Sequence, residues 1–318
     1  MVTGFLSEFG KKLAERWFSL LVLPGALFMA VVAAARTLGH AHPADLPRLG
    51  DQVTAWASTP AARSIGGQVV LLAAGLAAAA VAGLAAQGLG VLVERLTLAA
   101  DWRDWPGPLR HATGRLVARR RRRWNSAATR WHQLREEAAR ARARSQRADP
   151  AARRAAYRAM TRIAPEAPDR FTWCGDRLNA VAVRLERDLH VDASVCWPHL
   201  WLILPDATRT EITAARQALT RATTLTAWAA LYLPLVWWWW PAAAVSGALG
   251  LTGWRRTRAA TDTYAVLLEA ATRIHTRELA DHLGLDTATS PTDIGDALTR
   301  HLAGQPQPPS PPPAHGQP

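Results

Sequence analysis

Stretches without a charged side chain alternate along this chain with stretches that are dense in arginine. The uncharged stretches are Trp17–Ala35 with 19 residues, Ser64–Val93 with 30 and Ala222–Trp254 with 33. The hydrocarbon core of a bilayer is about 30 Å thick and needs roughly 20 helical residues, whereas apolar stretches of about 10–14 residues are typical of buried helices. Three stretches of this length predict an integral membrane protein.

The third stretch is too long for a single crossing. At about 1.5 Å per residue it would extend roughly 50 Å as a helix. Trp237–Trp240 interrupt it and Pro241 follows. Indole rings favour the membrane interface, and proline interrupts a helix. We therefore predict a helical hairpin that rises over residues 222–238 and returns over residues 240–257. One steeply inclined span is the alternative.

The predicted fold class is all-α, with four membrane spans and a helical, strongly basic cytoplasmic domain between the second and third spans. The predicted order is a cytoplasmic N-terminus (1–16), a first transmembrane helix (17–37), an extracytoplasmic loop (38–66), a second transmembrane helix (67–93), the basic helical domain (94–221), the transmembrane hairpin (222–257), a cytoplasmic helical segment (258–304) and a disordered, proline-rich tail (305–318).

The arginines predict the orientation of the spans. The segment from Glu94 to Arg221 carries 26 arginines against 14 acidic residues. Because loops rich in Lys and Arg stay in the cytoplasm, this segment and both termini are expected on the cytoplasmic side of the plasma (inner) membrane. Trp17 and Trp254 adjoin basic residues and are assigned to the inner interface. A cleaved signal peptide is the alternative interpretation of the first span.

The tryptophan quartet is assigned to the opposite, outer interface of the membrane. Its members are Trp237, Trp238, Trp239 and Trp240.

Composition changes this interpretation only in part. The chain has 318 residues, a formal net charge of +13 and 49% hydrophobic residues, and this mean alone would be typical of a soluble protein. Lys11 and Lys12 are the only lysines among 38 basic residues. Two cysteines exclude a disulfide-stapled secreted domain, and Cys174 and Cys196 are expected to be small buried residues.

The three uncharged stretches contain no Asp, Glu, Lys, Arg or His, which disfavours a self-contained ion-coupled transporter. They do contain small residues four positions apart, which let helices approach closely in lipid. These residues are Gly75, Ala79 and Gly83 in the second span and Ala243 and Gly247 in the fourth. We expect them to pack the spans of one chain together. A homo-oligomer assembled through Gly75–Gly83 is the alternative.

The basic domain contains an unbroken row of five arginines, and each is a candidate contact for anionic lipid: Arg119, Arg120, Arg121, Arg122 and Arg123. Basic clusters close to a cytoplasmic membrane face attract acidic lipid with about 1 kcal/mol per charge. Trp124 and Trp131 are seven residues apart and share one helical face. A solvated helix without a specific partner and a nucleic-acid-binding helix are the alternatives.

The remainder of the basic domain has clear helix signals. Asp149 followed by Pro150 predicts a helix start, with the helix ending near Ile163. A stripe of Leu178, Val181, Leu185 and Leu189 predicts an amphipathic helix over residues 175–190. Further helices are expected from about residue 192 to 205, and from residue 206 into the third span.

Three segments of this region resemble a family of uncharacterised actinobacterial multi-pass membrane proteins. They are Thr-Trp-Cys-Gly-Asp-Arg-Leu-Asn-Ala from Thr172, Leu-His-Val-Asp ending at Asp192, and Trp-Pro-His-Leu-Trp-Leu-Ile-Leu-Pro over residues 197–205. The resemblance covers roughly residues 169–285. His190 stands where the family usually has glycine, and His199 where it has arginine. The resemblance implies paired transmembrane helices after these segments and no particular activity.

Motifs of nucleotide binding, metalloproteases and serine hydrolases are absent from the sequence. His275, Glu278 and His282 share a helical face, but a solvated surface explains them better than a metal site. We therefore expect no cofactor and no enzyme. The favoured function is a membrane anchor or scaffold that presents its basic domain to anionic lipid or to a cytoplasmic protein partner. The alternatives are a channel or transporter subunit and a membrane-tethered nucleic-acid-binding protein.

Overall fold

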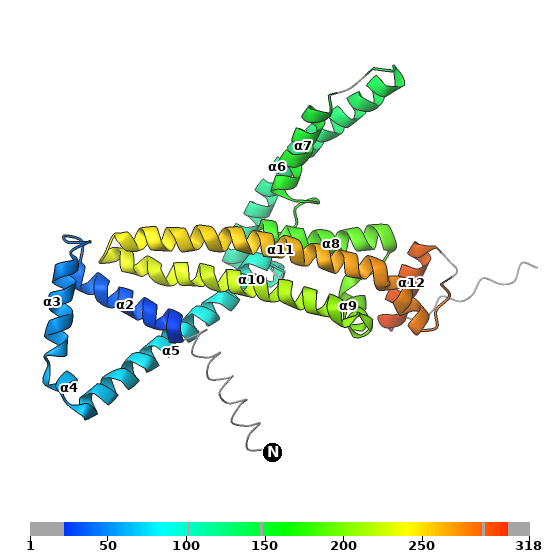
Figure 1. Cartoon of the computed structure of the whole chain (residues 1–318). Coiled ribbons are helices and arrows are strands. Elements are labelled where there is room, and N and C mark those ends of the chain that lie inside the picture. The colour runs from blue at the N-terminus through cyan, green and yellow to red at the C-terminus, as the bar shows by residue number, and fades with distance from the viewer. Residues whose placement is uncertain (1–21, 101, 147–148, 288–289, 305–318) are drawn as a thin grey trace, which may run out of the picture. The chain divides into compact units, whose positions relative to one another are not determined.

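The computed structural model describes residues 22–100, 102–146, 149–287 and 290–304. Within these ranges every regular element is a helix and no strand occurs (Figure 1). The all-α class predicted from the sequence is thereby confirmed. The proline-rich tail 305–318 and Trp17 lie outside the described residues.

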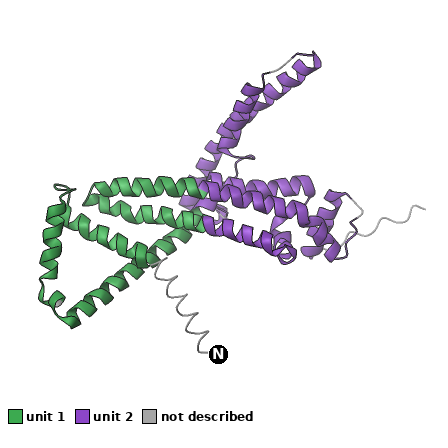
Figure 2. Ribbon diagram, viewed as in Figure 1, with its two compact units in different colours: residues 1–96, 219–257 green, residues 97–218, 258–318 purple. Residues whose placement is uncertain are grey.

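The chain divides into two compact units (Figure 2). Unit 1 comprises residues 1–96 and 219–257, and unit 2 comprises residues 97–218 and 258–318. Three long helices contribute residues to both units, namely α5 (Ile65–Leu98), α10 (Asp206–Tyr232) and α11 (Pro241–His282). Because these boundaries fall close to the ends of the uncharged stretches, the division follows the alternation of apolar and arginine-dense sequence.

Unit 1 contains α2 (Leu23–Leu38), α3 (Leu46–Ala57), α4 (Pro60–Arg63) and its parts of the three long helices. Helix α2 packs closely on α5, because a Cβ atom at Gly25 would lie 1.9 Å from the carbonyl oxygen of Ala79. It also packs on α10, where the rings of Phe28 and Tyr232 meet edge to face at 5.1 Å.

The chain turns between α10 and α11 through the 3₁₀ helix η3 (Leu233–Trp237). Pro241 begins α11, where a missing backbone N–H costs nothing. The two helices then run back along each other, since the Ser246 hydroxyl donates to the carbonyl oxygen of Ala229 at 2.8 Å. A Cβ atom at Gly253 would lie 2.4 Å from the Thr226 hydroxyl oxygen. The segment therefore folds as a helical hairpin.

One helix of the described residues, α5, is long and apolar enough to cross a membrane by length and composition. It has 34 residues, and its most apolar window has a mean hydropathy of 2.4. Helix α2 is apolar but has 16 residues. Helices α10 and α11 do not meet this criterion, because the apolar part of each continues into a charged part of the same helix.

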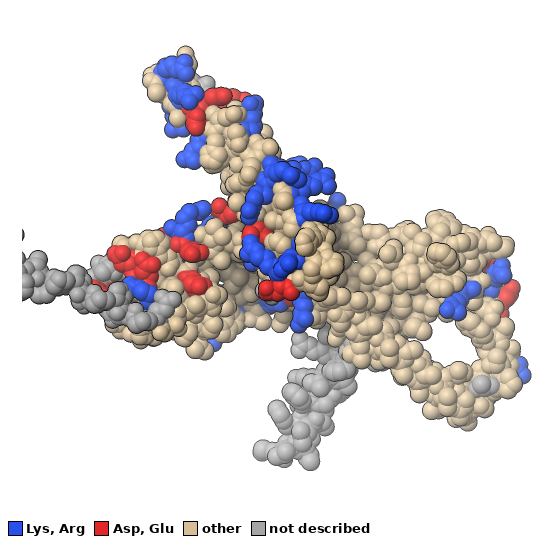
Figure 3. Space-filling view, turned by 180° about the vertical axis from the view of Figure 1, so that it is seen from behind, with Lys and Arg blue, Asp and Glu red and all other residues tan. Residues whose placement is uncertain are grey.

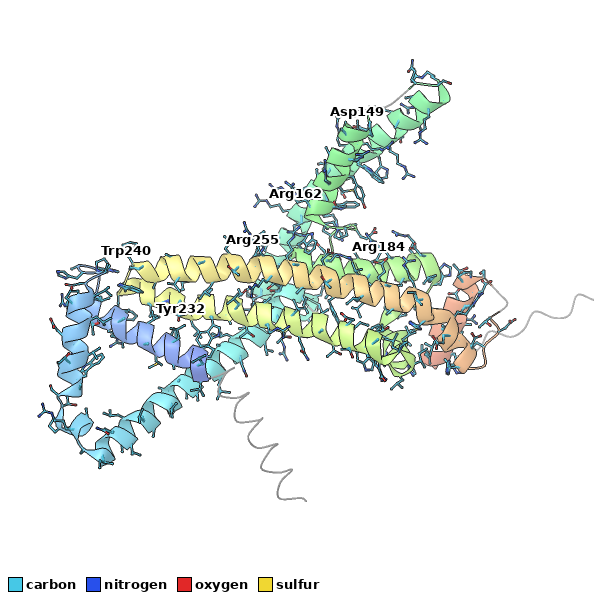
Figure 4. All side chains as sticks on the ribbon, viewed as in Figure 1. Asp149, Arg162, Arg184, Tyr232, Trp240 and Arg255 are labelled. Carbon is cyan, nitrogen blue, oxygen red and sulfur yellow. The ribbon has the colours of Figure 1, made fainter. Side chains whose placement is uncertain are left out.

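Unit 2 begins with the short 3₁₀ helix η2 (Trp102–Asp104) and the hairpin of α6 (Gly107–Ala143) and α7 (Pro150–Ile163). Asp149 lies at the start of α7 (Figure 4) and accepts hydrogen bonds from the backbone N–H groups of Ala151 and Ala152. This cap and the end at Ile163 confirm the boundaries predicted from the sequence.

The amphipathic helix predicted over residues 175–190 is α8 (Trp173–Leu189). It starts two residues earlier than predicted, because the Thr172 hydroxyl accepts the N–H of Gly175 and caps it. Val181 and Leu185 pack with Ala265 of α11 in a buried cluster. Helix α9 (Ala193–Ile203) follows and ends just before Pro205, as predicted.

The last helix, α12 (Pro291–Leu302), closes one end of unit 2. Ile294 and Leu298 are buried in a cluster with Cys196, Leu200 and Leu279. A Cβ atom at Gly295 would lie 1.8 Å from the carbonyl oxygen of Leu189, so the backbones of α12 and α8 are in direct contact.

Candidate functional site

The five consecutive arginines of α6 point to two different sides of the helix. Successive residues are rotated by about 100° in an α-helix. Arg120 and Arg121 therefore lie on the side that contacts the loop before α8. Arg119, Arg122 and Arg123 share the opposite side and are exposed. The sequence predicts one cluster of five lipid contacts. In the structure, Arg120 and Arg121 instead make contacts within the protein.

Arg120 is an internal residue of unit 2. Its guanidinium donates to the Asp176 carboxylate at 2.6 Å and to the carbonyl oxygen of Ile163 at 2.7 Å. Arg121 donates to the carbonyl oxygen of Pro168 at 3.1 Å and lies 3.5 Å from the Asp169 carboxylate. We therefore withdraw Arg120 as a lipid contact, because its terminal nitrogen donates to two protein acceptors. Arg121 also binds the protein, but its side chain is still 52% exposed.

Asp176 is the centre of this internal network. It is 3% exposed and accepts the backbone N–H groups of Asp169 at 2.9 Å and Arg170 at 2.7 Å, besides the Arg120 guanidinium. Burial raises the pKa of the Asp176 carboxyl above its usual range, and these hydrogen bonds oppose that rise. The carboxyl thus joins α6, α8 and the loop between α7 and α8.

Other side chains hold the same loop by its backbone. The indole of Trp124 donates to the carbonyl oxygen of Ala164 at 3.0 Å, and the indole of Trp102 donates to that of Asp169 at 3.0 Å. The Thr172 hydroxyl donates to the carbonyl oxygen of Thr97. These contacts fix residues 164–172 between α6 and α8, a role that no periodic pattern in the sequence could indicate.

A second group of ion pairs joins α8 to α11. Arg177 donates to Asp262 at 2.6 Å, and Arg184 contacts Glu269 at 3.5 Å and Glu166 at 2.9 Å. Arg184 projects from α8 and is labelled in Figure 4. Many acidic residues of unit 2 are thus used to neutralise arginines of its own helices.

The exposed arginines of α6 form a continuous surface. We call Arg115, Arg119, Arg122 and Arg123 the arginine face; they lie on one side of α6, and all four are exposed. In Figure 3 basic side chains gather over the α6–α7 hairpin. In the part of the chain that the structure describes, none of these four arginines forms an ion pair with an acidic side chain, and their charge is available to anionic ligands.

Farther along the α6–α7 hairpin, aromatic and basic side chains alternate. The rings of Trp131 and Tyr157 lie 5.8 Å apart, and the Arg135 guanidinium lies over the Trp131 ring at 5.5 Å. A cavity of about 430 Å³ adjoins them, with Arg153, Arg154 and Arg158 in its lining. Such combinations of ring faces and guanidinium groups can stack on planar anionic molecules.

The tryptophans assigned to membrane interfaces fall into two kinds. Trp237, Trp238 and Trp240 are 82%, 47% and 58% exposed, and Trp254 is 58% exposed. Trp239 is half-buried and donates from its indole to the carbonyl oxygen of Pro43 at 2.9 Å. Trp239 therefore ties the α10–α11 turn to the segment after α2, whereas the other three members of the quartet are available at the surface.

The small residues predicted to pack the helices are only partly in packed positions. Ala79 and Gly83 are buried in α5, but Gly75 meets open space. In α11, Ala243 and Gly247 are exposed, and the packed small residues with the same spacing are Ala242 and Ser246. The predicted pair lies one residue from the packed pair, and the sequence does not distinguish them because both have the same four-residue spacing.

The remaining candidates for chemistry have structural surroundings. Cys174 and Cys196 are buried and free, as expected, and burial raises the pKa of both thiols. His275 contacts the Glu278 carboxylate at 2.6 Å, and the Nδ1 atom of His282 lies 2.8 Å from the Glu278 carbonyl oxygen. Within the described ranges no group of three His, Cys, Asp or Glu side chains could hold a metal ion.

His190 has an unusual backbone conformation at the end of α8. Its φ angle is 55° and it adopts the left-handed region that glycine favours. Its Nδ1 atom lies 3.0 Å from the Asp296 carboxylate of α12. Glycine would suit this position because it adopts the left-handed region without a steric penalty.

Comparisons with protein-family models, with curated proteins and with solved structures find no match for this chain.

Proposed function

We propose that the protein is a plasma-membrane scaffold with four spans, formed by the first apolar helix, α5 and the two helices of the hairpin. The length and composition of α5 support one crossing directly. The α10–η3–α11 turn supports two more, because exposed tryptophans gather where the chain reverses. The resemblance to the family of actinobacterial membrane proteins implies the same paired transmembrane helices, and we include it in this proposal.

The proposed activity is non-enzymatic binding of unit 2 to anionic lipid. The observation that carries it is the division of the arginine row: Arg120 and Arg121 donate to protein acceptors, whereas the other three members are exposed on the opposite face and have no protein acceptor among the described residues. Each basic residue near an acidic membrane surface contributes about 1 kcal/mol, so the arginine face supplies a usable attraction. This contact would position unit 2 at the membrane, where it is presented to a cytoplasmic protein partner.

The test uses the full-length protein in nanodiscs of neutral lipid and its co-flotation with separate vesicles. One vesicle preparation contains about one third phosphatidylglycerol and the other is neutral. We expect flotation with the anionic vesicles only. We also expect it to fall between about 0.1 M and about 1 M salt, where the Debye length shrinks from about 10 Å to about 3 Å.

The decisive variant replaces Arg119, Arg122 and Arg123 with Gln. Loss of three contacts of about 1 kcal/mol each should weaken vesicle binding by about 100-fold. The matched control replaces Arg140 and Arg142 in the last turn of α6 and Arg144 just after it with Gln. All three are exposed, and the change removes the same charge. Equal losses in the two variants would contradict a lipid-binding arginine face and leave only a general effect of net charge.

The Trp131–Tyr157 region favours nucleic acid as a second candidate ligand. Its aromatic pair and adjoining arginines have the composition of a stacking surface for single strands. Binding of the nanodisc-held protein to a labelled single-stranded oligonucleotide tests this candidate. Loss of binding on changing Trp131 to Ala, with no loss in the Arg119, Arg122 and Arg123 variant, would support it. Absence of oligonucleotide binding would exclude it.

A further inference from the structure

Unit 2 contains an apolar cavity that neither the arginine face nor the ion-pair network uses. Its volume is about 470 Å³, and it lies among residues of α8, α9, α10 and α11 and the last residue of α5. Leu178, Val181, Trp197 and Leu268 are among its lining residues. Cavities that hold small ligands measure about 300–1,000 Å³ and have mostly apolar walls.

The cavity adjoins residues that belong to, or pack against, two buried clusters of the same unit. One cluster is centred on Val181, Leu185 and Ala265, and the other on Leu204, Ile212 and Ala271. Leu268 packs against both clusters and lines the cavity. The cavity is open to solvent on one side, so its walls leave apolar surface that an apolar ligand would cover.

The cavity has one charged group among the described residues that line it, Arg216 of α10. The Nη1 atom of Arg216 is shielded from solvent. Guanidinium groups bind carboxylate and phosphate through paired hydrogen bonds. The hydroxyl-bearing residues Ser194 and Thr272 also line the cavity. An apolar cavity with one arginine in its lining fits a molecule that has an alkyl chain and an anionic head group.

The position of the lining in the chain also favours a lipid-derived ligand. Leu98 lines the cavity and follows the last residue of the first segment of unit 1, Leu96, by two positions. Arg216 precedes Leu219, where the chain enters unit 1 again, by three positions. The cavity is thus built partly from residues that adjoin the uncharged stretches along the chain.

We infer that this cavity binds a single-chain amphiphile with a carboxylate or phosphate head. The alkyl chain lies against Leu178, Val181 and Leu268, and the head is held by Arg216. The inference goes beyond the proposed scaffold function. It depends neither on the number of spans nor on the arginine face, since every lining residue belongs to unit 2.

The experiment uses the full-length protein in a non-ionic amphipol, which removes bulk lipid. Three photoreactive probes with the same alkyl chain are compared: a fatty acid, a single-chain phosphate monoester and a neutral fatty alcohol. Adducts are located by proteolysis and mass spectrometry. We expect the anionic probes to label residues 178–185 and 264–272, and unlabelled palmitate to compete. The stronger anionic probe identifies whether the head is a carboxylate or a phosphate.

Two variants and a control separate the chain site from the head site. Ala182 of α8 lines the cavity yet is exposed, so A182W should fill the cavity and abolish labelling by all three probes. R216Q should lower labelling by the anionic probes by about tenfold or more and leave that by the alcohol unchanged. R209Q, on the same helix outside the cavity, should change neither.

Labelling that palmitate does not displace in the unmodified protein would overturn the inference, and this measurement requires no variant. Equal effects of R216Q on the anionic and neutral probes would overturn the role of Arg216. The variant of Arg119, Arg122 and Arg123 should label normally. Failure of vesicle binding and failure of amphiphile binding are therefore distinguishable.

Discussion

Individual residues of unit 2 show how one charge type can serve two purposes. Arg120 and Arg119 are neighbours in a row of identical side chains, yet one is bound to the buried carboxyl of Asp176 and the other is exposed. The helical period determines this division, and the carboxyl that selects Arg120 lies 56 residues away in sequence. The sequence alone therefore shows the row of arginines but cannot say which of its members are used internally.

Replacing Asp176 with Ala should destabilise unit 2. The change leaves two backbone N–H groups and the Arg120 guanidinium without their acceptor, at about 1–3 kcal/mol for each unsatisfied group. Allowing for relaxation, we expect a loss of about 3 kcal/mol, measured by thermal unfolding through tryptophan fluorescence. Asn retains one acceptor and should fall between Ala and the parent. The control Glu136→Gln, in an exposed pair with Arg140, should change stability by less than about 0.5 kcal/mol.

The same carboxyl predicts a pH dependence of stability. Burial raises the pKa of Asp176 in the folded protein, so the folded state binds its proton more tightly than the unfolded state does. Its contribution to stability is then greatest below the unfolded pKa of about 3.9 and is lost as the pH rises through the folded pKa. Asp176→Asn should remove this part of the pH profile. Unchanged slopes between the two proteins from pH 4 upward would contradict the assignment.

His190 offers a test of backbone strain. A non-glycine residue in the left-handed region is disfavoured by roughly 1 kcal/mol, and the exposed contact of His190 with Asp296 contributes about 0–1 kcal/mol. His190→Gly should therefore retain or slightly raise the unfolding temperature, and His190→Ala should lower it. The comparison of these two variants isolates the conformational effect, because both remove the same imidazole. A lower unfolding temperature for Gly than for Ala would show that strain is unimportant here.

At the scale of elements, close helix packing in unit 1 depends on residues without side chains at a few positions. Gly25→Ala would place a Cβ atom 1.9 Å from the Ala79 carbonyl oxygen and must separate α2 from α5. Because overpacking costs about 1–3 kcal/mol, we expect a clear fall in unfolding temperature. Gly75→Ala is the matched control on α5, where the new methyl group meets open space. Equal effects of the two changes would contradict direct contact of α2 and α5.

The packed faces could be predicted only in part. Alternation of leucine and valine positions at helical spacing identified α8 and its buried side, because those positions are few and separated by charges. In α11 the sequence offers small residues at almost every position from 241 to 247, and no polar residue marks the outer face. The register of that helix is set by the partners Ala229 and Thr226, which periodicity cannot reveal.

At the scale of the molecule, the separation of uncharged and arginine-dense sequence corresponds to two structural units. The helices that belong to both units could not be divided from the sequence alone, since their charge changes within one continuous helix. Four spans remain a proposal, with α5 as the crossing that length and composition support.

Reporter fusions test the proposed topology of the whole chain. Fusions after residues 50 and 239 should be active with a reporter that requires export, and fusions after residues 150 and 310 with one that requires the cytoplasm. This pattern follows from the arginine excess of residues 94–221 and the positive-inside rule. A cytoplasmic signal at residue 239 would contradict the proposal that the hairpin of residues 222–257 crosses the membrane.

The contact of α12 with α8 has a practical consequence for shortening the chain. Ile294 and Leu298 cover a cluster that includes Leu200 and Leu279, and Gly295 lies against the Leu189 backbone. Truncation before Pro291 would uncover that cluster and invite aggregation, whereas truncation after Gly304 would leave it covered. An affinity tag is therefore best attached beyond residue 304, where its removal by a protease would leave the cluster intact.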